Sequence, residues 1–229
     1  MKFPPCAALA FAATLIALPA GHAAVILSTD FSGRTVSGKT ASNITWVTGG
    51  VGDPGDLTWV LESGGPTNTA LFDTANAQGH FAPDLNLENE GPWSATIPLA
   101  LAAPQVQLDE VVLDWQHFNN SGVFQAASRL ATWTVSVIGS VSGEIASASS
   151  PEIGGTSGIE SIRFAAPVSL DNSETYGLKI FVTGNGPGNN TGLDGVTVNG
   201  SVVPEPSAPA MISAALAMLG IIRRRPPLV

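Results

Sequence analysis

The sequence predicts an all-β fold, an antiparallel β-sandwich or jelly roll with a short apolar helix at each end of the chain. Between residues 24 and 200, polar and apolar residues alternate, and no apolar pattern recurs at the helical period. The alternating runs are rich in β-branched and aromatic residues, and Gly, Asn, Asp and Pro separate them. About ten such runs at this spacing are typical of two packed antiparallel sheets.

The clearest run is Thr132–Ile138, in which polar and apolar residues alternate almost without a break. The other expected strands, in chain order, are Val25–Phe31, Ile44–Val47, Leu57–Leu61, Ser94–Leu99, Val106–Trp115, Val141–Ala146, Ser161–Phe164, Tyr176–Thr183 and Leu193–Val198. The segment Gly64–Glu90 has the least regular pattern, and we expect long loops there.

The first 23 residues have the three parts of a Sec signal peptide. Lys2 supplies the positive charge, residues 7–18 form the apolar run, and small residues stand at the −3 and −1 positions of a cleavage site after Ala23. Cleavage after Ala24 is the alternative site. An uncleaved membrane anchor is the alternative function, although the run is shorter than the ~20 residues of a spanning helix.

Removal of this segment leaves a domain, 24–201, that contains no cysteine. The only cysteine of the chain is Cys6, which precedes the predicted cleavage site. The domain therefore has no disulfide, no thiol nucleophile and no cysteine metal ligand. Its length, roughly 180 residues, is enough to bury one core without such links.

The charges of the predicted domain are strongly unbalanced. Eighteen acidic residues stand against five basic ones between the two terminal segments, a net charge of −13. Such a surface repels the phosphate backbone, so we expect no nucleic-acid partner. It suits an extracellular protein, and it could hold cations.

The C-terminal segment, 202–229, differs in composition from the domain. A Pro-Glu-Pro triplet precedes an apolar run, 208–222, which three arginines follow. Fifteen residues at a rise of 1.5 Å make a helix of about 22 Å, so a membrane of ~30 Å would have to thin locally around it. The arginines place the C-terminal end in the cytoplasm and the domain outside. The residues of the triplet and the cluster are Pro204, Glu205, Pro206, Arg223, Arg224 and Arg225.

This order of triplet, apolar helix and arginine cluster resembles the PEP-CTERM sorting signal of Gram-negative bacteria. The resemblance covers about 26 residues. It implies processing by a membrane protease of the exosortase type, with Pro204, Glu205 and Pro206 as the recognition element, and delivery to the cell envelope or extracellular matrix. A plain C-terminal membrane anchor is the alternative. The chain departs from the common pattern in the four residues, 226–229, that trail the arginines.

The last expected strand begins Leu193-Asp194-Gly195-Val196. It resembles the final strand of many PEP-CTERM ectodomains and of jelly-roll carbohydrate-binding modules, which often have an Asp-Asn-Val-type strand, with glycine here in place of asparagine. Acidic jelly rolls often hold a structural Ca²⁺ near the first and last strands. Asp30 and Asp194 are the candidate ligands, since domain termini often lie close together. The alternative for Asp194 is a turn or cap residue.

Paired carboxylates would support a second function, glycoside hydrolysis. On Val106–Trp115 alternate residues point to opposite faces, so Glu110 and Asp114 are expected on one face. Nothing else marks a catalytic pair, and we expect these carboxylates to be solvated. The groups available are Glu88/Glu90, Asp109/Glu110/Asp114 and Asp53/Asp56.

Histidine and tryptophan give further candidates. After export only His80 and His117 remain, and no Gly-x-Ser-x-Gly motif is present, so we predict no catalytic residue. Trp133 and Trp115 are in phase with apolar neighbours and are expected in the core. Trp93, in a loop-rich stretch, is the best candidate for an exposed ring that stacks on a sugar.

Two functions follow from the sequence. The first is a non-enzymatic protein of the envelope or extracellular matrix, with weak affinity for exopolysaccharide and an exosortase-type processing partner. The second is a secreted carbohydrate-active enzyme on the same fold. An enzyme requires a cleft that holds two carboxylates ~5–10 Å apart beside an aromatic ring.

Overall fold

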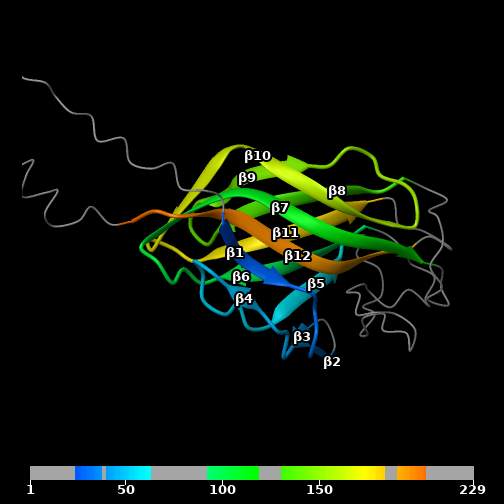
Figure 1. Cartoon of the computed structure of the whole chain (residues 1–229), viewed down its shortest axis with the longest axis horizontal. Coiled ribbons are helices and arrows are strands. Elements are labelled where there is room, and N and C mark those ends of the chain that lie inside the picture. The colour runs from blue at the N-terminus through cyan, green and yellow to red at the C-terminus, as the bar shows by residue number, and fades with distance from the viewer. Residues whose placement is uncertain (1–23, 38–39, 63–91, 119–129, 184–189, 205–229) are drawn as a thin grey trace, which may run out of the picture.

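The computed structural model describes residues 24–37, 40–62, 92–118, 130–183 and 190–204 (Figure 1). All regular structure in these ranges is β-strand, which confirms the predicted all-β class. The described ranges contain no helix that is long and apolar enough to cross a membrane. The two predicted terminal helices lie outside the described residues. The strands are β1 (Ala24–Thr29), β2 (Thr35–Ser37), β3 (Thr40–Ser42), β4 (Val47–Thr48), β5 (Leu57–Leu61), β6 (Trp93–Leu99), β7 (Gln105–Phe118), β8 (Thr132–Gly139), β9 (Gly143–Ser149), β10 (Ser157–Asp171), β11 (Tyr176–Thr183) and β12 (Asn190–Val202).

The strands form two sheets in which every strand pair is antiparallel. The five-stranded sheet has the order β10-β7-β12-β1-β4, and the seven-stranded sheet has the order β2-β3-β5-β6-β11-β8-β9. Figure 1 shows β12 running through the middle of the five-stranded layer, between β7 and β1. Most strands that are neighbours in a sheet are distant in sequence. For example, β1, the first strand, pairs with β12, the last.

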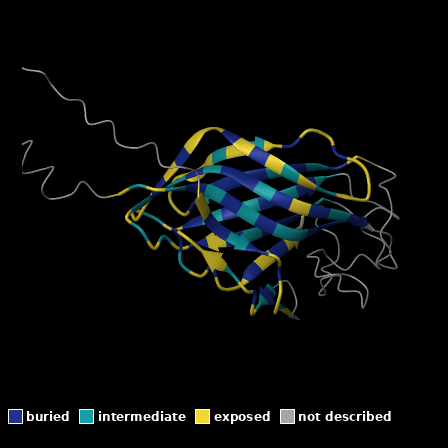
Figure 2. Ribbon diagram, in the orientation of Figure 1, coloured by how far each residue is buried: buried dark blue, intermediate teal, exposed yellow. Residues whose placement is uncertain are grey.

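One apolar core fills the space between the two sheets. Every second side chain of β8 and β11 is buried, and Figure 2 shows the same alternation along the other long strands. The five-stranded sheet contributes its own inward side chains to the same cluster. The arrangement is therefore β-sandwich-like. Inward residues from both sheets include Val111, Leu113, Val196, Val198, Trp133, Val135, Leu178 and Ile180.

Several expected strands match the structure, and one does not. Leu57–Leu61 and Tyr176–Thr183 are β5 and β11 as predicted. The expected strand Ile44–Val47 is wrong, because the chain reaches the sheet only at β4, after Asn43 adopts a positive φ of 58°. The expected Ser161–Phe164 is part of the much longer β10.

The ends of the described chain lie side by side. Ala24 pairs with Gly200 and Thr29 pairs with Val196. Beyond β12, the amide of Val203 donates a hydrogen bond of 3.0 Å to the carbonyl of Gln105. Both predicted terminal segments therefore join the sandwich at the same end of the five-stranded sheet.

Candidate functional site

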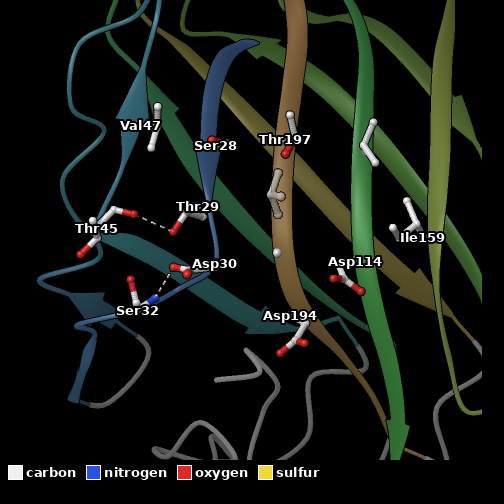
Figure 3. A pocket seen from close by; sticks show the side chains of 13 residues that line it. Ser28, Thr29, Asp30, Ser32, Thr45, Val47, Asp114, Ile159, Asp194 and Thr197 are labelled. Carbon is white, nitrogen blue, oxygen red and sulfur yellow. Dashed lines mark hydrogen bonds between the residues drawn. The ribbon is translucent and has the colours of Figure 1, made fainter. Parts of the chain in front are cut away.

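An open groove of about 490 Å³ crosses the outer face of the five-stranded sheet, at the end away from Ala24 (Figure 3). Along β7 and β12 the alternate residues Leu113, Val196 and Val198 are buried in the core, so the residues between them face outward. These outward residues and their neighbours form the groove. The lining includes Ser28, Asp30, Val112, Asp114, Asp194 and Thr197.

A β-bulge in β12 shapes the middle of the groove. The register between β12 and β7 shifts between Leu193 and Gly195, so that Asp194 has no residue opposite it on β7. Bulges bend a strand locally and re-aim a side chain. A Cβ atom on Gly195 would lie 3.2 Å from the carbonyl oxygen of Thr29 and 3.6 Å from Cβ of Asp114. The bare glycine thus keeps the groove open between β1 and β7.

Asp30 is held at one side of the groove by the turn that follows β1. The amide of Ser32 donates a hydrogen bond of 2.9 Å to Oδ1 of Asp30. Hydrogen bonds from the Ser32 side chain and backbone lower the pKa of Asp30. The turn is fixed by Thr29, whose hydroxyl donates to the carbonyl of Thr45 at 2.9 Å and accepts the amide of Phe31. Asp30 is therefore an ionised carboxylate at neutral pH.

The charge of Asp194 on β12 acts on Asp114 on the neighbouring strand β7. Desolvation at the groove wall and, second, the charge of Asp194 raise the pKa of Asp114. The side-chain amide of Gln116 donates a hydrogen bond of 2.6 Å to Oδ2 of Asp194. The groove thus concentrates negative charge, and a cation placed between these carboxylates would relieve their repulsion.

The two aspartates predicted to bind calcium, Asp30 and Asp194, line the same groove. Their strands are neighbours, which brings them to one face of the sheet. However, no three Asp, Glu, His or Cys side chains within the described ranges are grouped so that they could hold a metal ion. In Figure 3 the carboxylates of Asp30, Asp194 and Asp114 do not converge on one point. The calcium site stays a prediction.

The expectation that Trp93 is exposed is wrong. Its side chain is 0% exposed, and its ring meets that of Trp133 edge to face, with centroids 5.8 Å apart. The indole Nε1 donates a hydrogen bond of 3.1 Å to the carbonyl of Thr191. Trp93 is therefore a core residue, and its ring has no exposed face on which a sugar could stack. Trp115 and Trp133 are buried, as predicted.

Glu110 shares the outer face with Asp114, as predicted, but lies outside the groove in a closed polar cluster. Its carboxylate accepts hydrogen bonds from the hydroxyl of Ser161 and, at 3.1 Å, from the side-chain amide of Asn199. The guanidinium of Arg163 forms an ion pair of 3.1 Å with it. These contacts join β10, β7 and β12, which indicates a structural role.

None of the remaining candidate residues predicted from the sequence is among the described residues that line the groove. Pro204 is exposed just beyond β12. The remaining residues of the triplet and the arginine cluster are outside the described residues, as are His80, Glu88 and Glu90. Asp53 accepts a hydrogen bond of 2.8 Å from the amide of Gly55 in the loop before β5.

Sequence reasoning did not identify the groove as a whole. Ser28, Thr197, Val112 and Asp114 each occupy an unremarkable outward position on a strand. They meet because β1, β12 and β7 are neighbours in the sheet, with Ser28 opposite Thr197 and Thr197 opposite Val112. In the sequence, only the Asp194-Gly195 pair of the last expected strand is typical of a bulge.

No protein-family model matches the chain, and no curated protein matches it either.

Proposed function

We propose that this chain is an exported protein, processed through a PEP-CTERM-like tail and displayed at the cell surface or in the extracellular matrix of a Gram-negative bacterium. The β-sandwich is then a non-enzymatic module with weak affinity for exopolysaccharide. A membrane protease of the exosortase type is the processing partner. The membrane holds the protein only until the tail is removed.

The position of the strands relative to the two processing sites carries this proposal. β1 begins at Ala24, directly after the predicted signal-peptide cleavage at Ala23. β12 ends at Val202, before the Pro-Glu-Pro triplet. Both cuts would therefore spare every strand of the sandwich, which is the arrangement that maturation at both ends requires.

The strand orders support a jelly roll for this module. One sheet contains the run β10-β7-β12-β1 and the other the run β6-β11-β8-β9. Consecutive strands such as β6 and β7, or β10 and β11, thus lie in different sheets, as in two interlocked Greek keys. Jelly rolls of this kind include lectin domains, but fold alone does not assign a ligand.

Intact-mass measurement of the protein from its natural host tests the proposal. The expected product begins at Ala24 and has lost most of the chain after Pro206. A variant with Pro204, Glu205 and Pro206 all changed to alanine should keep its arginine cluster and stay with the membrane fraction. The matched control is Pro226→Ala with Pro227→Ala, which changes prolines beyond the arginines and should be processed normally. Wild-type protein that retains the arginines would reduce the tail to a plain anchor.

The groove gives a specific reason to keep the second function, a carbohydrate-active enzyme. Desolvation and, second, the charge of Asp194 raise the pKa of Asp114, and a carboxyl group with a raised pKa beside a second carboxylate is the arrangement that a general acid needs. No aromatic ring lines this groove among the described residues. A carbohydrate-active enzyme is therefore the second candidate function.

An assay of reducing-end release from neutral and amino-sugar polysaccharides separates the two functions. Turnover that disappears in Asp114→Asn, but persists in Glu144→Gln on the other sheet, would assign hydrolysis to the groove. The non-enzymatic proposal expects no turnover from the wild type.

A further inference from the structure

The groove on the five-stranded sheet is lined by negatively charged side chains. Asp30, Asp114 and Asp194 line it, and no Lys or Arg is among the lining residues in the part of the chain that the structure describes. Two ion pairs of the described residues lie outside it: Arg163 binds Glu110, and Lys179 lies 2.6 Å from Glu62 on the seven-stranded sheet. An anionic polymer would be repelled here, whereas a cationic one would be attracted.

The three carboxylates are spread across the groove. Asp30 follows the end of β1 and Asp114 lies on β7, with Gly195 of β12 between them. Two strand spacings separate the backbones of β1 and β7, about 10 Å. Calcium takes six to eight oxygens at 2.3–2.6 Å from one point, whereas no three Asp, Glu, His or Cys side chains of the described ranges are grouped around one point. Positive charges distributed along an extended ligand suit it better.

The rest of the lining suits sugar rings. The hydroxyl-bearing residues Ser28 and Thr197 lie opposite each other on β1 and β12. Val47, Val112 and Ile159 add apolar surface, and Ile159 is 72% exposed. A sugar ring presents hydroxyl groups at its edge and C–H groups on its faces, so this mixture of polar and apolar side chains matches it.

We propose that the groove binds a polysaccharide whose sugar units carry free, protonated amino groups. This inference rests on the proposed glycan affinity and names both its site and the chemical class of its ligand. The carboxylates hold the ammonium groups, the hydroxyls bond the ring edges, and the valine and isoleucine side chains contact the ring faces.

Titration calorimetry of the full-length protein in mild detergent tests this. The probes are a hexamer of glucosamine and the same hexamer fully N-acetylated, which has the same rings but no charge, at about pH 6. The glucosamine hexamer should bind at least about tenfold more tightly, and its affinity should fall as salt rises from 0.05 to 0.5 M, because exposed charge pairs are screened. A third arm measures the melting temperature with calcium and with chelator.

Substitutions locate the binding. Asp114→Asn and Asp30→Asn should each weaken the glucosamine hexamer about threefold to fivefold, the usual effect of one solvent-exposed charge pair. Glu144→Gln removes the same charge from exposed β9 on the other sheet and should leave the affinity unchanged. Melting curves without glycan show whether each variant is folded.

Equal affinities for the two hexamers overturn the proposal, as do unchanged affinities in both aspartate variants. Stabilisation by calcium without binding of the glucosamine hexamer also overturns it, and would assign the groove to the metal. None of these outcomes changes the mass or location of the mature protein, so display at the cell surface is tested separately.

Discussion

His117 is a buried ionisable side chain at the end of β7. Its ring packs on Trp115 with centroids 4.7 Å apart, and its Nδ1 lies 2.8 Å from the carbonyl oxygen of Gly155. Since a carbonyl only accepts hydrogen bonds, Nδ1 carries the proton. Nε2 is buried and has no hydrogen-bond partner among the described residues. Burial therefore lowers the pKa of His117, partly offset by the bond to Gly155.

This environment predicts a loss of stability in mild acid. A histidine whose pKa is depressed by folding stabilises the fold fully above its unfolded pKa of about 6.5, and that contribution is lost as pH falls below this value. Between about pH 7.5 and 5.5 the unfolding free energy should fall by up to ~1.4 kcal/mol per pH unit at the steepest point. Urea denaturation across this range measures it.

The variant His117→Gln should flatten this pH dependence, since it removes the titrating ring. His80→Gln, at the other histidine of the predicted mature chain, is the matched control and should retain the slope. An unchanged slope in His117→Gln would show that other groups cause it. The carboxylates of Asp30 and Glu110, whose pKa values are lowered by hydrogen bonds, lose their contribution only at lower pH.

At the scale of single residues, the burial of Trp93 was predictable from the alternation in its own strand, but not from the residues that precede it. Trp93, Ala95, Ile97 and Leu99 alternate with Ser94, Thr96 and Pro98, and all four are buried. The phase of this run predicts an inward ring, whereas the preceding Gly-Pro is typical of a loop. The exposure of a tryptophan next to a strand is better predicted from the phase of the strand than from the residues before it.

At the scale of elements, β12 has a glycine at each of its two register shifts with β7. The register shifts between Leu193 and Gly195, and again between Asn199 and Gly200, where the extra residue, Asp109, is on β7. A Cβ atom on Gly200 would overlap the carbonyl oxygen of Gln107, a backbone atom that cannot move aside as a side chain can. The close approach of β12 and β7 at this point therefore requires glycine.

The variant Gly200→Ala should lower the unfolding free energy by about 1–3 kcal/mol, the typical cost of overpacking. The control is Gly52→Ala, where the added Cβ would meet the carbonyl of Ala100 at an ordinary 3.6 Å. Its stability should change much less. Thermal and urea denaturation of both variants measure the difference, and equal destabilisation would contradict the packing argument.

Long strands were predictable where one face packs on the core, because burial of alternate residues leaves its pattern in the sequence. β8 and β11 show this most clearly. The short strands β2 and β3, rich in Thr and Ser, have no such pattern and were not predicted. The closeness of the first and last strands was expected, and β1 pairs with β12. The rest of the strand order, such as β12 beside β7, was not predictable because it depends on contacts between distant parts of the chain. The groove depends on that order, so only its separate residues could be named.

At the scale of the whole molecule, the described strands form a unit that should fold without the terminal segments. Fragment 24–203 is expected to give a far-UV circular dichroism spectrum of β-structure. Its melting temperature should not respond to dithiothreitol, since Cys6 lies outside it. A fragment 24–189, which lacks β12, should not fold, because β12 pairs with both β7 and β1. A helical spectrum, or a folded 24–189 fragment, would contradict this architecture.

The central position of β12 also determines how the domain responds to force. If the chain is pulled at Val203 while the far end of the sheet is held, the load runs along β12. The hydrogen bonds to β7 and β1 lie across that direction and share the load, so they must break together. Pulling Ala24 and Val203 apart instead opens the β1–β12 pair from one end, bond by bond. A domain held through the C-terminal end of β12 and loaded at the groove is therefore pulled in its mechanically strong direction.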